Sequence, residues 1–111
     1  MKIPADAVIP LDKITRYLLV FRERDDKSKF LTKAGFTPKN PHRLLAALSE
    51  LAATTEAVED GDNEYGEFFR TEGRLNGPNG RALPVVLIWL RRYADGQFRF
   101  VTLKPLKEQT A

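Results

Sequence analysis

Three lysines lie close together in the segment DDKSKFLTKAGF, residues 25–36, at Lys27, Lys29 and Lys33. On a helix, ammonium groups at this spacing form one of two surfaces. One is a solvated face with no specific ligand, and the other is a basic surface that holds the phosphates of an anionic polymer. The segment also carries two phenylalanines, so the same helix is expected to bury one side in the core.

Other kinds of reactive site have little support in the sequence. His42 is the only histidine and cysteine is absent, so neither a Ser-His-Asp arrangement nor a thiolate metal site is predicted. The acidic run EDGDNEYGE, residues 59–67, lacks the ligand spacing of a calcium loop. The glycines of residues 76–80 precede a predicted strand rather than a helix, which argues against a phosphate loop. We therefore predict no metal and no cofactor.

The charge is unevenly distributed along the chain. Residues 1–49 hold 10 Lys and Arg against 5 Asp and Glu, residues 50–80 hold 2 against 8, and residues 81–111 hold 6 against 2. The net charge of +3 thus hides two basic segments around an acidic one. Basic segments that meet in the fold would attract an anionic polymer, whereas segments of opposite sign that meet would neutralise each other.

Length and composition predict one domain, residues 1–111, in the cytoplasm. A chain of 111 residues is short for two independent cores. The absence of cysteine suits a reducing compartment, and the proline-containing N-terminus does not resemble a signal peptide. The longest apolar run, residues 83–90, is too short to cross a bilayer, so no membrane association is expected.

The first half of the chain has helical periodicity. Apolar residues at helical spacing predict helices over residues 11–20, from Asp25 or Asp26 to Ala34, and from Pro41 onward through residue 54. Asn40 is expected to cap the third helix. Gly35 follows the second helix, where positive φ is favoured.

The second half alternates in the manner of strands, with runs over residues 56–59, 64–75, 82–93 and 97–104. The sequence NGPNG and the pair Asp95-Gly96 predict turns between antiparallel strands. The predicted fold class is therefore α+β, with about three N-terminal helices (residues 10–54) packed on one face of a C-terminal antiparallel meander of about four strands (residues 55–105). The residues expected in the core are Leu44, Leu48, Leu51, Val86, Ile88 and Phe100.

The strands offer aromatic and polar groups side by side. Trp89 is near Arg91, and strict alternation would place Phe98, Phe100, Thr102 and Lys104 on one face. Aromatic rings beside cations can stack a nucleotide base and hold its phosphate, so Trp89, Phe98 and Thr102 are candidate substrate-binding residues. The other interpretation is that Trp89 is a core aromatic.

Several motifs together resemble a known family. The segments KITRYLL, KSKFLTKAGF, LNGPNGR, the strand with Trp89, and FVTLKP resemble, in this order, a family of small prokaryotic proteins of unknown function. The layout of helices followed by an antiparallel sheet is also similar to the barnase/EndoU/colicin/RelE-like ribonuclease superfamily. Arg22 and Arg24 occupy the region where family members often carry a histidine, and Lys104 replaces a tyrosine.

The resemblance implies a toxin-type, metal-independent endoribonuclease of a bacterial toxin–antitoxin or phage-defence system. In such enzymes lysines and arginines orient the RNA and stabilise the phosphorane. The residues expected to act in this way are Lys27, Lys29, Arg81, Arg91 and Lys104. The alternative hypothesis is a non-enzymatic interaction module, such as an antitoxin, immunity protein or phage-borne inhibitor, that uses the acidic segment 56–67. The predicted partner is accordingly RNA or an acidic cognate protein.

Overall fold

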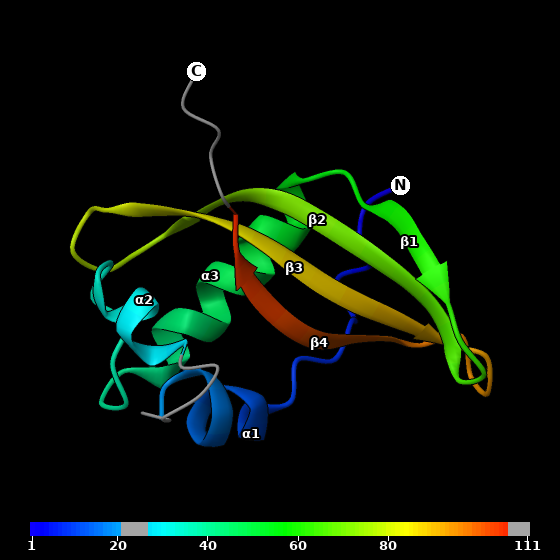
Figure 1. Ribbon diagram of the computed structural model, residues 1–111, viewed down its shortest axis with the longest axis horizontal. Coiled ribbons are helices and arrows are strands. Elements are labelled where there is room, and N and C mark those ends of the chain that lie inside the picture. Colours follow the sequence, from blue (N-terminus) through cyan, green and yellow to red (C-terminus); the bar gives the residue numbers. More distant parts are fainter. Residues whose placement is uncertain (21–26, 107–111) are drawn as a thin grey trace.

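Four strands and a set of short helices make up the computed structural model, which describes residues 1–20 and 27–106 (Figure 1). The helical elements are α1 (Leu11–Lys13), the π-helix η1 (Ile14–Leu18), α2 (Ser28–Thr32) and α3 (Pro41–Thr54). The strands are β1 (Val58–Asp62), β2 (Gly66–Asn76), β3 (Ala82–Arg92) and β4 (Phe98–Pro105). They form one antiparallel sheet in the order β1-β2-β3-β4, which confirms an α+β fold with a four-stranded meander.

Tight turns join the long strands where the sequence predicts them. Gly80 ends the NGPNG turn with φ +86°, and Gly96 in the β3–β4 turn has φ +69°. Both values lie in the region that favours glycine. Gly77 is constrained differently, because a Cβ there would lie 2.1 Å from the carbonyl oxygen of Ala34. The turn therefore packs directly against the segment that follows α2.

The first two predicted helices differ from those observed. The helix expected over residues 11–20 is one turn of α-helix followed by η1, which closes with Leu19 N–H donating to the Ile14 carbonyl at 3.0 Å. Asp25 and Asp26, the expected caps, lie outside the described residues, and α2 begins at Ser28. Gly35 has φ +91°, as predicted after a helix.

The third helix begins at Pro41 as predicted, but Asn40 does not cap it. Its side-chain oxygen accepts a hydrogen bond from the Thr37 N–H at 2.8 Å, and its amide donates to the Gly35 carbonyl at 3.1 Å. The Asn40 side chain thus closes the preceding loop instead of the helix.

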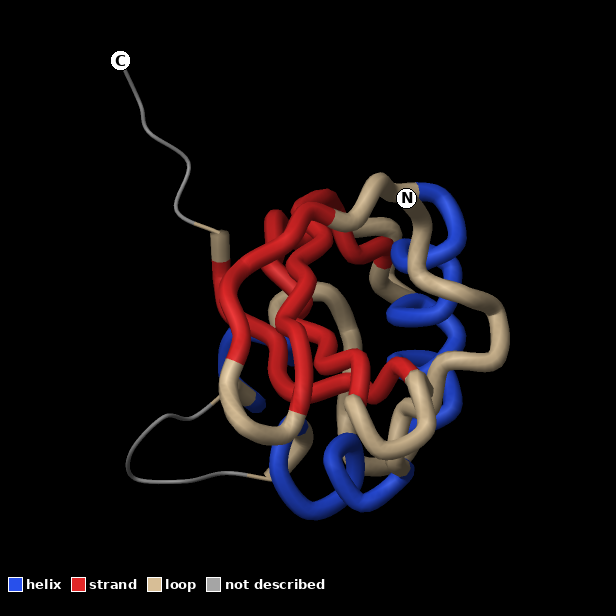
Figure 2. Tube along the Cα trace, turned by 90° about the vertical axis from the view of Figure 1, so that its right-hand side faces the viewer, coloured by secondary structure: helices blue, strands red, loops and turns tan. Residues whose placement is uncertain are grey.

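The core lies between α3 and one face of the sheet, and Figure 2 shows the strands curling around one side of the molecule with helical segments on the other. Leu44, Leu48, Leu51 and Phe100 are buried as predicted. Val86 and Ile88 were expected in the core, and this prediction is wrong. The core-facing residues of β3 are Leu83, Val85, Leu87 and Trp89.

The predicted packing of all helices on one face also needs correction. Among the described helices, α3 is the one that lies along the sheet, against β2, where its Leu51 approaches Gly73. The end of α2 meets the 76–80 turn, because the Asn79 side chain donates to the Lys33 carbonyl at 3.0 Å. The α1–η1 segment lies beside the edge strand β4.

A β-bulge changes the faces of β4. Ile88 pairs with Thr102 but Trp89 pairs with Phe100, which leaves Val101 as the extra residue. Phe98 and Phe100 therefore point into the core, whereas Thr102 and Lys104 point to the opposite face. The prediction that these four residues share one face is wrong, because strict alternation does not allow for a bulge.

The N-terminal segment crosses the core-facing side of the sheet. Its start is held by the Ala57 N–H, which donates to the Met1 carbonyl at 2.7 Å, and its end by a bridge between Val8 and β4 at Arg99. Within the described residues, no helix is both long and apolar enough to span a membrane.

Candidate functional site

A cleft of about 460 Å³ opens between the α1–η1 segment, the start of α2 and β4. Its lining residues are Lys13, Tyr17, Lys27, Val101, Thr102 and Lys104. Three ammonium groups and two hydroxyl groups thus face one space, and none of the lining residues that the structure describes is acidic. Such a cleft attracts anions, since its positive charges concentrate the field in a recess.

Local structure explains why these side chains meet. Within the α1–η1 segment, Lys13 and Tyr17 are four residues apart, and the Lys13 ammonium lies 5.8 Å from the centre of the Tyr17 ring. A contact of this type holds the lysine beside the tyrosine ring, and both residues line the cleft. On β4, the bulge at Val101 directs Thr102 and Lys104 away from the core and toward the same space.

The cleft contains three of the residues singled out in the sequence, namely Lys27, Thr102 and Lys104. It also contains Lys13 and Tyr17, which the sequence analysis missed. The signal was present, because a lysine and a tyrosine four residues apart lie on one face of a helix. That stretch was interpreted through its apolar residues, so its polar side was overlooked.

Arg91 lies elsewhere, on the face of the sheet that points toward the core. Its guanidinium donates to Glu67 at 2.5 Å and lies 5.4 Å from the Phe69 ring centre and 5.8 Å from that of Phe98. These contacts give Arg91 a packing role at the end of β3 remote from the 76–80 turn.

The other two predicted cations, Arg81 and Lys29, lie neither in the cleft nor near Arg91. Arg81 is exposed at the opposite end of β3, roughly 30 Å from Arg91 at about 3.3 Å per strand residue. Lys29 is exposed on α2 and does not line the cleft. The expected convergence of all five cations on one groove is therefore not observed.

The two aromatic candidates are core residues. Trp89 is fully buried, its indole N–H donates to the Thr71 hydroxyl at 3.2 Å, and its ring meets Phe100 edge to face at 5.6 Å. Phe98 is 6% exposed and packs against Phe69 with ring centres 5.4 Å apart. Neither ring lines the lysine cleft, because both belong to the face that packs inward.

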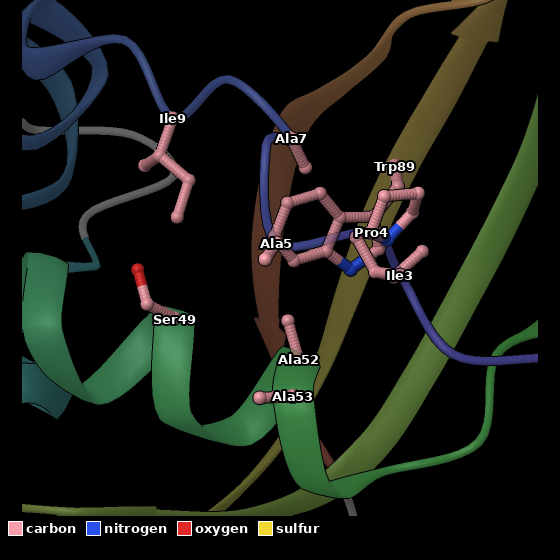
Figure 3. A pocket seen from close by; sticks show the side chains of 9 residues that line it. All are labelled: Ile3, Pro4, Ala5, Ala7, Ile9, Ser49, Ala52, Ala53 and Trp89. Carbon is pink, nitrogen blue, oxygen red and sulfur yellow. The ribbon is translucent and has the colours of Figure 1, made fainter.

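A second cavity, of about 220 Å³, lies between the N-terminal segment and α3 (Figure 3). Trp89, Ile3 and Pro4 are among the lining residues, and Ser49 supplies a side-chain hydroxyl. None of the lining residues is charged. The described residues also contain no group of three or more His, Asp or Glu side chains able to hold a metal ion. The lysine cleft is thus the stronger candidate for a functional site.

Comparison with protein-family models identifies the family of this chain. The model of a family of domains of unknown function, DUF6883, matches residues 4–107. The chain belongs to this family. The matched range includes all the motifs on which the resemblance to a family of unknown function rests. No curated protein matches the sequence of this DUF6883 domain.

A solved structure shares the fold of the DUF6883 domain. It is a chain of a contact-dependent growth inhibition toxin–immunity protein complex from Klebsiella pneumoniae 342. The match covers 90% of this chain and 100% of that chain, with a TM-score of 0.69 and 22% sequence identity. At this identity the similarity establishes a common fold.

Proposed function

We propose that this DUF6883 domain is a small basic RNA-binding protein that acts as a toxin-type, metal-independent endoribonuclease of a bacterial toxin–antitoxin or phage-defence system. The observation that carries the proposal is the cleft in which Lys13, Lys27 and Lys104 face one space with two hydroxyl groups and, among the described residues, no acidic side chain. An acidic protein surface is the other ligand that such charges would suit, but a recess is better matched to a narrow, flexible phosphate backbone.

The proposed reaction requires no cofactor. The 2′-hydroxyl of a ribose attacks the adjacent phosphorus, the bond from phosphorus to O5′ breaks, and the products are a 2′,3′-cyclic phosphate and a 5′-hydroxyl. The 2′-hydroxyl gives up one proton and the leaving O5′ takes one. Ammonium groups close to the phosphate stabilise the negative charge of the phosphorane. The Tyr17 hydroxyl and the lysines are the groups of the cleft that can exchange protons with the RNA.

The shared fold is consistent with this assignment. The matched chain belongs to a toxin–immunity protein complex, so a chain with this fold is a component of such a complex. A toxin of this type would act on cytoplasmic RNA and would be held in check by an acidic cognate protein that covers the lysine cleft. The lysines of the cleft would then bind either RNA or the cognate protein.

A non-enzymatic interaction module is the alternative, and one observation favours it. All five residues of β1 are exposed at the edge of the sheet, and Glu59, Asp60 and Asp62 give this edge negative charge. An acidic edge strand of this kind suits a basic partner protein, as an antitoxin or immunity protein would need.

RNA binding at several salt concentrations separates the two functions. Three phosphate contacts on single-stranded RNA predict that log Kd varies with log salt with a slope of about 2 in magnitude, from about 0.7 per contact. The double variant Lys27→Ala/Lys104→Ala should reduce this slope by about 1.4. It should also lose the cleavage activity that the wild type is expected to retain in EDTA. The matched control is Lys33→Ala/Lys39→Ala, which removes the same charge from exposed positions outside the cleft.

The control should bind and cleave RNA nearly as the wild type does. Equal losses in both double variants would mean that net charge, and not the cleft, governs binding. Absence of RNA binding by the wild type at low salt would favour the interaction module.

A further inference from the structure

The outer face of the sheet, which points away from α3, is apolar at its centre, and its rim carries three cations and one acidic residue, Glu72. Its residues are identified by strand register, since they pair with one another and point away from the buried positions of each strand. We define the outer face by Phe68, Arg70, Glu72, Val86, Ile88, Leu90, Arg99, Thr102 and Lys104.

Neighbouring rows of the outer face combine the two properties. Leu90 lies between Phe68 on β2 and Arg99 on β4, and Ile88 lies between Arg70 and Thr102. The Phe68 ring and the aliphatic groups at the centre are half-buried. An apolar surface bordered by guanidinium groups is suited to a ligand with flat bases and a charged backbone.

The cations of the rim differ in their partners. Arg70 pairs with Asp60 at 3.3 Å and Glu72 at 3.4 Å, so its charge is largely compensated. Among the described residues, neither Arg99 nor Lys104 takes part in a salt bridge. The β4 side of the outer face is therefore the side with charge available to a ligand.

The outer face is continuous with the lysine cleft, because Thr102 and Lys104 belong to both. Lys104 pairs with Val86 and Arg99 with Leu90, four residues further along β3, which corresponds to about 13 Å. From these observations, and on the basis of the proposed function, we infer that an RNA strand bound in the cleft continues over the outer face toward Arg99 and Phe68.

This path selects single-stranded RNA. To contact Phe68 and Leu90 the bases must be free to lie on the sheet, whereas the bases of a duplex are paired and stacked on one another. A second copy of this chain is a poor occupant of the same face, because two such faces would bring Arg99 and Lys104 of each copy together. An acidic protein remains the rival occupant, and the experiment below distinguishes it.

The test compares a 2′-O-methyl uridine octamer, which cannot undergo the proposed cleavage, with the corresponding trimer, which is short enough to be held by the cleft alone. Eight nucleotides fall within the range of about 4 to 16 found for single-strand binding folds. We expect the octamer to bind at least tenfold more tightly than the trimer, and at least tenfold more tightly than a duplex of eight base pairs. Binding is measured by fluorescence anisotropy for the octamer and by competition for the other two.

Two variants locate the additional contacts. Arg99→Ala should weaken binding of the octamer and lower the salt slope of that binding by about 0.7. Binding of the trimer should be unaffected. Phe68→Ala should lower the affinity for the octamer about tenfold, as loss of a residue that stacks on a base does. The matched control is Arg43→Ala on α3, an exposed arginine outside both surfaces, and a urea unfolding curve for each variant verifies its fold.

The possible results separate this inference from the proposed function. If the octamer binds no better than the trimer, or if Arg99→Ala matches the Arg43→Ala control, the proposed path over the outer face is wrong. The proposal that RNA binds in the cleft is unaffected by this result. A duplex that binds as tightly as the octamer also overturns the inference. If neither oligomer binds, both proposals fall, and the outer face is better explained as a surface for an acidic protein.

Discussion

The 76–80 turn contains two glycines that are required for different reasons, and alanine substitutions should distinguish them. Gly80 has φ +86°, but a Cβ there would meet nothing within 4 Å. Gly80→Ala should therefore cost only the backbone strain, about 1 kcal/mol. A Cβ on Gly77 would lie 2.1 Å from the Ala34 carbonyl oxygen and 2.4 Å from its Cβ. Because backbone atoms must move to accommodate it, Gly77→Ala should cost about 2 to 3 kcal/mol.

Urea unfolding of the two variants measures these costs as changes in the free energy of unfolding. For a domain of this size, each kcal/mol corresponds to a fall in Tm of about 4 °C. Gly80→Asn provides a control, because asparagine tolerates positive φ better than alanine and should be the milder change. The reasoning is refuted if Gly77→Ala is no less stable than Gly80→Ala, or if Gly80→Asn is the most damaging of the three.

Two further predictions concern a buried hydrogen bond and a titrating pair. Trp89→Phe and Thr71→Val should each cost about 1 to 3 kcal/mol, because each leaves a buried polar partner unsatisfied. The double variant should cost less than the two together, as urea unfolding would show by a coupling of at least about 0.5 kcal/mol. The Met1 ammonium, which donates to Glu56 at 2.8 Å, lowers the pKa of Glu56 below its ordinary value. The pKa of Glu56 is lower in the folded than in the unfolded chain. The pair therefore stabilises the fold at pH values above the unfolded pKa, and this stabilisation is lost as the pH falls through the folded pKa. An NMR titration of Glu56 should show a midpoint below that of an unfolded control peptide, and an equal midpoint would contradict the pairing.

Much of the fold could be predicted from local patterns. The change from helical to alternating periodicity near Thr55 marks the end of α3 and the start of the sheet. Glycine and proline then mark the turns, because few other residues adopt the required backbone angles. The patterns failed at the π-helix η1 and at the bulge at Val101, since neither feature has a distinctive signature in a single sequence.

The candidate site could be predicted only in part. Lys27, Thr102 and Lys104 were singled out for their chemistry, and they do line one cleft. Arg91 was singled out on the same grounds, yet it packs over two phenylalanine rings on the inward face. Residue type alone does not distinguish a cation that faces a ligand from one that faces the core.

The sequence by itself determined the fold class, the meander and the turns, because these depend on interactions between residues close in the chain. Only the tertiary structure decided which face of β3 is buried, since both faces of this strand are apolar and the choice depends on where α3 packs. It also decided that Lys13 and Lys104, which are 91 positions apart, share a cleft. No local preference encodes that proximity, because it results from the packing of the α1–η1 segment beside β4 and from the bulge that turns Lys104 outward.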